Sequence, residues 1–172
     1  MFQLKNLKFK SKFIRFISSF LFIILVYYSL TAFAFFNDLI LMLAGYGAEI
    51  SSFVINMFGA ESNYFGNTLF TIQNSLKVSI GCDGSEPIVY LLAAIVSYPA
   101  QYLKKLIGIL IGSTILFLVN ISRIISLFYI SESSPKYFDL IHNDFMPFFT
   151  LVSSLGLFYI WMLWVNKYKD NQ

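Results

Sequence analysis

Two reactive side chains occur only once in this chain, the thiol of Cys82 and the imidazole of His142. A thiol beside an imidazole can act as a nucleophile, because the imidazole accepts the thiol proton and leaves the more reactive thiolate. Taken singly, each residue has a plainer interpretation. A lone cysteine usually packs as a small hydrophobic residue, and a lone histidine at a membrane surface is usually solvated. The chemistry therefore depends on whether the fold brings the two together.

The residues around Cys82 predict a turn that leads into a helix. Ser85 has a side chain preferred at a helix N-cap, and Pro87 suits the first helical turn. Unpaired N–H groups at a helix N-terminus favour a nearby thiolate, whereas the carboxylates of Asp83 and Glu86 disfavour it. A strongly activated thiol would therefore need a further positive group.

Arg123 supplies such a group within a long apolar run. It lies seven residues before Ile130, which places it roughly 10 Å below the predicted end of its helix. A charged side chain at that depth costs on the order of 3 kcal/mol unless it is paired or faces a polar cavity. Asn120 lies three residues earlier on the same helix face and extends the polar stripe. Arg123 is therefore a functional candidate, with Asn120 as its supporting residue.

The composition of the chain identifies a membrane protein. Of its 172 residues, 58% are hydrophobic and only 12% are charged, whereas soluble domains carry about 25% charged residues. The net charge of +3 comes from basic residues at the ends of apolar runs, a distribution that argues against nucleic-acid binding. One cysteine excludes an intrachain disulfide. Because the chain also has only one histidine, we expect no zinc site and no cofactor.

The apolar runs predict an all-α membrane protein, a polytopic helical bundle that forms one domain over residues 1–172. The four predicted spans cover residues 16–36, 87–104, 106–130 and 145–165. The first run is longer than the roughly 7–15 residues of a signal-peptide core, so we expect an uncleaved anchor.

Two further segments complete the predicted bundle. Residues 38–58 have apolar side chains at helical spacing, but Glu49 would be costly at the bilayer centre. We therefore expect an interfacial or re-entrant helix. Residues 68–80 alternate around Asn74 and Ser75, a pattern that predicts a short β-hairpin outside the membrane.

Lysine and arginine clusters set the predicted topology. They lie at the N-terminus, at residues 104–105 and at residues 167–169, and the positive-inside rule places all three in the cytoplasm. Both termini would then be cytoplasmic in a multi-pass protein of the cytoplasmic membrane. The outer face would hold Cys82, Arg123 and His142. This convergence requires that residues 38–58 do not cross fully, because the hairpin would otherwise change sides.

From Lys77 to Trp164, the chain resembles the exosortase/archaeosortase family. The shared motifs are, in order, Gly81-Cys-Asp-Gly-Ser-Glu-Pro, Tyr98-Pro99, Lys104-Lys-Leu-Ile-Gly, Asn120-Ile-Ser-Arg-Ile and the isolated His142 before the last span. The motifs are specific in combination. The residue after the cysteine is often Ser, Thr or Asn in that family and is Asp83 here. The short chain resembles compact branches of the family, such as exosortase H.

This resemblance implies a membrane-embedded cysteine protease or transpeptidase that processes C-terminal sorting signals at the outer membrane face. The active cysteine, arginine and histidine of the family correspond to Cys82, Arg123 and His142. The implied substrates are secreted proteins that end in a short motif, an apolar helix and a basic tail. Membrane lipid would be the other partner.

Two alternatives remain open at this stage. In a non-enzymatic assembly factor or small transporter, Arg123 would bind an anion or a partner's carboxylate. A serine-type intramembrane protease is less well supported, because the chain has no Gly-x-Ser-x-Gly motif. Substituting Cys82 distinguishes an enzyme from the non-enzymatic alternative.

Overall fold

The computed structural model describes residues 2–71, 75–79 and 81–167, with side chains described from residue 11 onward. Its elements are α1 (Phe2–Leu30), α2 (Ala34–Met57), β1 (Asn63–Phe65), β2 (Thr68–Phe70), β3 (Ser75–Lys77), α3 (Ser85–Ser97), α4 (Tyr102–Ser133), the 3-10 turn η1 (Pro135–Tyr137), α5 (Phe138–Leu140), the π-helical turn η2 (Ile141–Phe145) and α6 (Met146–Lys167). The prediction of an all-α membrane protein is confirmed, since the three strands are a minor element.

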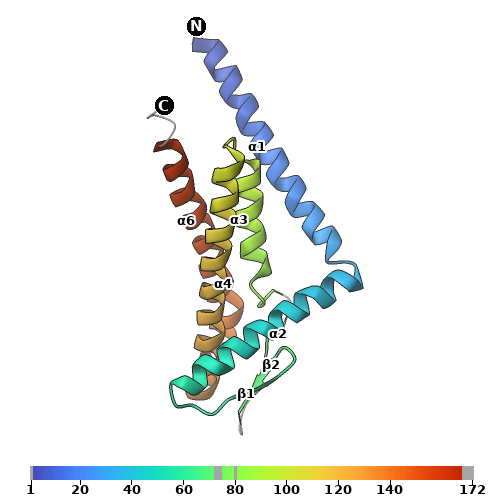
Figure 1. Ribbon diagram of the computed structural model, residues 1–172, viewed down its shortest axis with the longest axis vertical. Helices are drawn as coiled ribbons and strands as arrows, with labels where there is room; N and C mark the ends of the chain where they lie inside the picture. Colours follow the sequence, from blue (N-terminus) through green and yellow to red (C-terminus); the bar gives the residue numbers. More distant parts are fainter. Residues whose placement is uncertain (1, 72–74, 80, 168–172) are drawn as a thin grey trace.

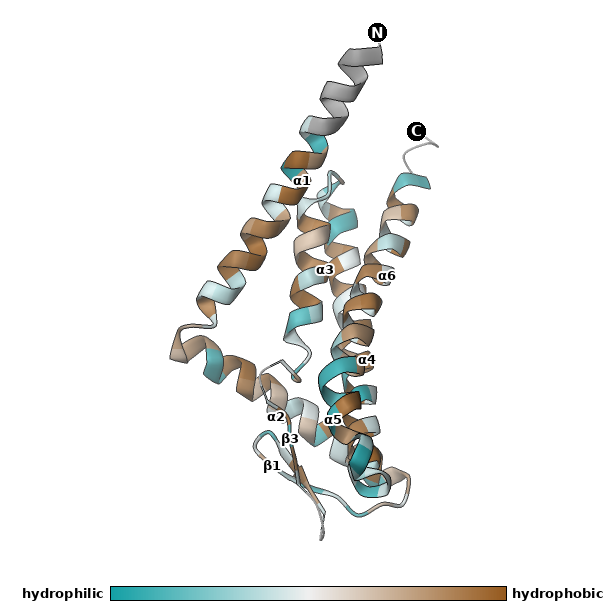
Figure 2. Cartoon of the chain, turned by 180° about the vertical axis from the view of Figure 1, so that it is seen from behind, coloured by the Kyte–Doolittle hydropathy of each residue, from teal (hydrophilic) through white to brown (hydrophobic). Residues whose placement is uncertain are grey.

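Four helical stretches in the described part of the chain are long and apolar enough to cross a bilayer. They are Ser11–Leu30, Ala34–Met57, Tyr102–Ser133 and Pro135–Lys167, while α3 is a shorter apolar helix. Hydrophobic residues cover long stretches of α1, α2 and α6 (Figure 2). Such surfaces are stable in contact with lipid tails, so the chain is a multi-pass membrane protein.

The helices α3, α4 and α6 form a compact group, and α1 joins it through α3 (Figure 1). Both ends of the chain lie at one end of this group. At the opposite end, α2 crosses obliquely and carries the small sheet (Figure 1).

Two clusters of buried side chains hold these layers together. One joins α3, α4 and α6 through Leu91, Ile95, Leu116, Trp161 and Val165. The other joins α2 and the sheet to α4 through Ala44, Ala48, Ile55, Leu69, Val78, Ile124 and Phe128. The second cluster lies under the loop that carries the thiol, because Cys82 packs against it.

The predicted span over residues 87–104 is not one helix in the structure. The helix α3 ends at Ser97, and Tyr98 is extended with φ −76° and ψ 138°. Pro99 explains the break, because a proline forces the residue before it out of the helical conformation and lacks an N–H donor. The chain then starts α4 at Tyr102, so residues 102–104 belong to the helix that was expected to begin at residue 106.

The first two helices also meet earlier than the predicted bounds. The helix α1 ends at Leu30, and α2 begins at Ala34 after an extended Phe33. Residues 34–36, which were assigned to the first span, therefore open α2. This helix is long and apolar enough to cross a bilayer by length and composition, and its interfacial or re-entrant placement stays a prediction.

The sheet has three antiparallel strands in the order β1-β2-β3, where the sequence predicted a two-stranded hairpin over residues 68–80. The missed hairpin joins β1 to β2 through Gly66 and Asn67, with φ +57° at Gly66. A Gly-Asn pair between two short strands is a hairpin signal that the alternation over residues 68–80 obscured. In the second hairpin Ser75 already pairs with Phe70, so it is not a turn residue. Asn74 and Ile80 lie outside the described residues.

Candidate active site

Cys82 lies in a turn before α3 that Asp83 holds in place. The Asp83 carboxylate accepts hydrogen bonds from the backbone N–H groups of Gly81, at 2.8 Å, and Ser85, at 3.0 Å. Gly84 is the N-cap of the helix, so the prediction of Ser85 as N-cap is wrong. Ser85 is the first helical residue, and its hydroxyl pairs with that of Tyr27 at 2.8 Å. Because two N–H donors share the Asp83 charge, it disfavours a thiolate less than its position in the sequence suggests.

Gly84 brings this turn into contact with α4. Its φ is +84°, and a Cβ atom there would lie 2.7 Å from Cγ of Asn120, so only glycine fits both the conformation and the space. Asn120 is 1% exposed, and its amide has no hydrogen-bond partner in the described part of the chain. Asn120 therefore contacts the turn that carries the thiol, whereas no hydrogen bond to Arg123 is found among the described residues.

Arg123 is buried in the same face of α4, with 3% of its surface exposed. Because α4 continues to Ser133, the residue lies about 15 Å before the end of its helix, deeper than the sequence suggested. One nitrogen, Nη2, donates to Cys82 Sγ at 3.5 Å. The other buried donor, Nε, has no partner among the residues that the structure describes.

His142 lies in the π-helical turn η2 that precedes α6. Its Nε2 is 2.9 Å from Cys82 Sγ, and its Nδ1 is 3.1 Å from Oδ1 of Asn143. With an oxygen acceptor at Nδ1, the neutral ring carries its proton there and presents the Nε2 lone pair to the thiol. The ring of Phe138 stacks on the imidazole with centroids 5.3 Å apart and 14° between the planes. Single-turn π-helices are frequent at functional sites.

The structure thus brings the three predicted site residues into contact around one sulfur atom. They come from the turn before α3, from α4 and from η2, three segments far apart in the sequence. Sequence reasoning missed Asn143 and Phe138. Phe138 could have been found from its spacing, because residues four positions apart lie on the same face of a helix. Asn143 follows His142 directly, and that spacing gave no such signal.

Two cavities adjoin this site on opposite faces of the start of α6. A cavity of about 350 Å³ lies between α4 and α6 and is lined by Arg123, Ser122, Ser126 and three apolar residues of η2 and α6. A second cavity, of about 290 Å³, lies between α3 and α6 and is lined by Gly81, Glu86 and Tyr90, among others. Either could receive part of a substrate that reacts at Cys82.

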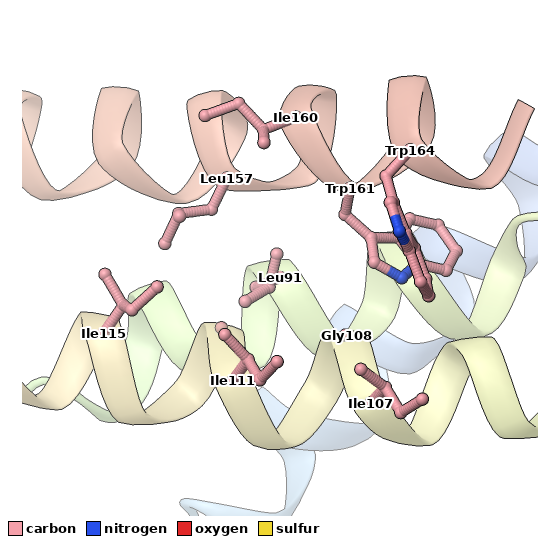
Figure 3. Close-up of a pocket in the computed structure, with 10 residues that line it drawn as sticks. Leu91, Ile107, Gly108, Ile111, Ile115, Leu157, Ile160, Trp161 and Trp164 are labelled. Carbon is pink, nitrogen blue, oxygen red and sulfur yellow. The ribbon is translucent and has the colours of Figure 1, made fainter. Parts of the chain in front are cut away.

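A third cavity, of about 390 Å³, lies elsewhere in the bundle, between α3, α4 and α6 (Figure 3). Its lining includes Gly108, Leu157 and Trp161 and contains no titratable side chain. The indole N–H of Trp161 donates to the backbone oxygen of Lys104 at 3.0 Å. With only apolar walls, this cavity has no means of catalysis.

No group of three or more His, Cys, Asp or Glu side chains in the described part of the chain could hold a metal ion. The site therefore offers a thiol, an imidazole and a guanidinium, which together suit acyl transfer through a covalent thioester.

Residues 9–160 match the sequence profile of the transmembrane exosortases. The chain belongs to this family. The family consists of membrane peptidases and transpeptidases that act on secreted proteins with C-terminal sorting signals. The resemblance seen in the motifs from Lys77 to Trp164 is thereby confirmed over most of the chain. The exosortase chain matches no curated protein and no solved structure.

Proposed function

We propose that this exosortase is a cysteine enzyme that cleaves C-terminal sorting signals of secreted proteins, with Cys82 as its nucleophile. The observation that carries this proposal is the sulfur's position. Cys82 Sγ lies 2.9 Å from an imidazole nitrogen and 3.5 Å from a guanidinium nitrogen. Membership of a peptidase and transpeptidase family supports the same reaction.

In the first step His142 activates the thiol. Its Nε2 accepts the Cys82 proton, and the resulting thiolate attacks the carbonyl carbon of the scissile peptide bond. The Asn143 amide holds the imidazole in the tautomer that this proton transfer needs. The imidazolium then protonates the leaving amine, so the peptide C–N bond breaks and a thioester remains on Cys82.

Arg123 stabilises the charge that develops during this attack. Its Nη2 contacts the sulfur before the reaction, and the negative charge moves from the sulfur to the carbonyl oxygen as the C–S bond forms. A buried guanidinium beside both atoms interacts more strongly with that charge than it would in water. The unpaired Nε provides a further donor on the same group.

An acceptor then resolves the thioester. A primary amine gives a new amide bond and thus transpeptidation, whereas water gives hydrolysis. The site lies at the end of the bundle opposite both chain termini (Figure 1). We place that end on the outer membrane face, because the basic N-terminal part of α1, the basic start of α4 and the basic end of α6 lie at the other end (Figure 1).

The proposal is tested by co-expressing the full chain with a secreted reporter that ends in a short motif, an apolar helix and a basic tail. Cys82→Ala should abolish processing of this reporter. Arg123→Gln should slow it about 100- to 1,000-fold, and His142→Ala about 100- to 10,000-fold. The measurement is the processed fraction on immunoblots over time.

Ser153→Ala serves as the control, because the Ser153 hydroxyl is exposed and bonds only its own helix among the described residues. All variants must reach equal levels in the membrane. Processing that continues with Cys82→Ala at equal levels would contradict the enzyme and favour a non-enzymatic membrane factor.

A further inference from the structure

The carboxylate of Glu86 lines a cavity between the first turn of α3 and the start of α6, next to the turn that carries Cys82. Its volume is about 290 Å³, and its lining includes Gly81, Glu86, Tyr90, Phe148 and Thr150. Gly81 directly precedes Cys82, so the wall of this cavity is the backbone that carries the thiol. The cavity is thus next to the reaction site, yet none of the three proposed catalytic side chains lines it.

Glu86 is the one ionisable carboxylate in the lining of this cavity, and it has no cationic partner there. Its carboxylate accepts a hydrogen bond from the Tyr28 hydroxyl at 3.5 Å, a long contact. The same hydroxyl pairs with that of Tyr90 at 2.8 Å. Arg123 acts on Glu86 only by longer-range attraction, because no ion pair is found for Glu86 within the described residues. A bound cation would stabilise the charge of a half-buried carboxylate that has no counter-ion.

The two cavities beside the thiol are suited to different parts of the reaction. On α6, Met146 and Phe149 line the cavity that contains Arg123. Phe148 and Leu151, on the other side of the same helix, line the Glu86 cavity. At 100° per residue these two pairs of α6 residues point in nearly opposite directions. The acyl group, whose oxygen needs Arg123, belongs on the first side. The second side is then free for the group that attacks the thioester.

We propose that the Glu86 cavity binds the acceptor of the reaction, a primary amine in its ammonium form. This inference rests on the proposed function, because it assigns a binding site for the second substrate of the Cys82 thioester. It also makes transpeptidation to an amine, rather than hydrolysis, the reaction that this site favours.

The transfer step balances with the groups at hand. The Glu86 carboxylate takes one proton from the ammonium, and the free amine attacks the thioester carbon. The new C–N bond forms, the C–S bond breaks, and the sulfur leaves as the Cys82 thiolate. His142, neutral after it has protonated the first leaving amine, takes the second nitrogen proton. The products are an amide and the thiolate–imidazolium pair, and Glu86 returns its proton to water.

The test uses the full chain purified in lipid nanodiscs and acylated with p-nitrophenyl acetate. The Cys82→Ala protein corrects for acetyl groups placed elsewhere. The acetyl-enzyme is then chased with increasing glycinamide, and the N-acetylglycinamide and free acetate are measured by mass spectrometry. The unmodified enzyme should show a saturable preference for glycinamide over water. Glu86→Gln should lower the ratio of the second-order rate with glycinamide to the rate with water at least tenfold.

Asp139→Asn is the matched control, because Asp139 is an exposed carboxylate on α5 that does not line the cavity. Leu151→Trp is a second variant that narrows the cavity and keeps the carboxylate, and it should also lower the amine rate. Acetylation of Cys82 with an unchanged amine rate in Glu86→Gln and Leu151→Trp would overturn the acceptor site alone. An absence of acetyl transfer to Cys82 would overturn the proposed nucleophile as well.

Discussion

At the scale of single residues, the proposed reaction of the thiol depends on the orientation of one imidazole. His142 meets Cys82 through Nε2 and Asn143 through Nδ1, so the amide acceptor selects the tautomer that can take the thiol proton. Phe138 holds the plane of the ring by stacking. Asn143 is exposed and does not contact the thiol, so it is a positioning residue rather than a catalytic one.

Replacing Asn143 tests this positioning role. Asn143→Ala should slow acetylation of Cys82 about three- to tenfold, because one orienting hydrogen bond contributes about 0.5–1.5 kcal/mol. Asn143→Asp should restore most of the rate, since its carboxylate also accepts a hydrogen bond from the Nδ1–H group of His142. The measurement is the burst of p-nitrophenol from p-nitrophenyl acetate.

The neighbouring exposed Asp144 provides the control as Asp144→Ala. If the role of Asn143 were merely structural, Asn143→Ala would lower the stability of the protein, and Asn143→Asp would not restore the rate of acetylation. Equal burst rates in Asn143→Ala and the unmodified enzyme would show that the amide has no part in orienting the ring.

At the scale of elements, strand β3 offers an open edge just before the nucleophile. The register pairs Leu69 with Leu76, and the N–H of Val78 donates to the oxygen of Asn67 at 2.8 Å. Antiparallel pairs alternate between bonded and non-bonded positions. The N–H and C=O groups of Lys77 therefore point away from β2, toward the edge of the sheet. An extended substrate segment could pair there and align its peptide bond with Cys82.

Substituting the edge residue tests this strand pairing. Lys77→Pro removes an outward N–H and spares the bonds to β2, so the sheet should survive. Processing of the secreted reporter should slow about two- to tenfold relative to Lys77→Ala, which removes the charge and keeps the N–H. Equal processing rates in the two variants at equal membrane levels would show that the sheet covers the site without pairing with the substrate.

At the scale of the whole molecule, the arrangement of helices separates the basic ends of the chain from the site. The N-terminus, the α3–α4 connection and the end of α6 lie at one end, and the turn of Cys82 lies toward the other (Figure 1). By the positive-inside rule we therefore expect the proposed reaction on the outer side, where secreted substrates arrive.

Cysteine labelling in intact cells tests this orientation. In a Cys82→Ala background, Lys136→Cys should react with a membrane-impermeant maleimide, because Lys136 lies exposed in η1 near the site end. Lys12→Cys should react only after the cells are permeabilised. Lys12 is exposed, but it lies near the N-terminus, which the proposed orientation places in the cytoplasm. The reverse pattern would place Cys82 in the cytoplasm and contradict processing at the outer face.

The amino-acid sequence by itself determined the fold class, the family and the three residues of the candidate site. Long apolar runs can only be stable as membrane helices, and a buried arginine, a lone cysteine and a lone histidine stand out against them. Pro99 was a local signal for the break after Ser97, because proline acts on its immediate neighbours, but the predicted span ran on to residue 104. The third strand was missed although the Gly66-Asn67 pair signalled it.

Only the tertiary structure decided how these parts meet. The 2.9 Å contact between Cys82 and His142 joins residues 60 positions apart, a distance that depends on how α3, α4 and α6 pack. Packing also placed Asn120 in the space beneath Gly84. It placed Glu86 in a cavity beside the thiol's turn. Local sequence could not reveal these roles, because each depends on which side chain from a distant segment occupies the adjoining space.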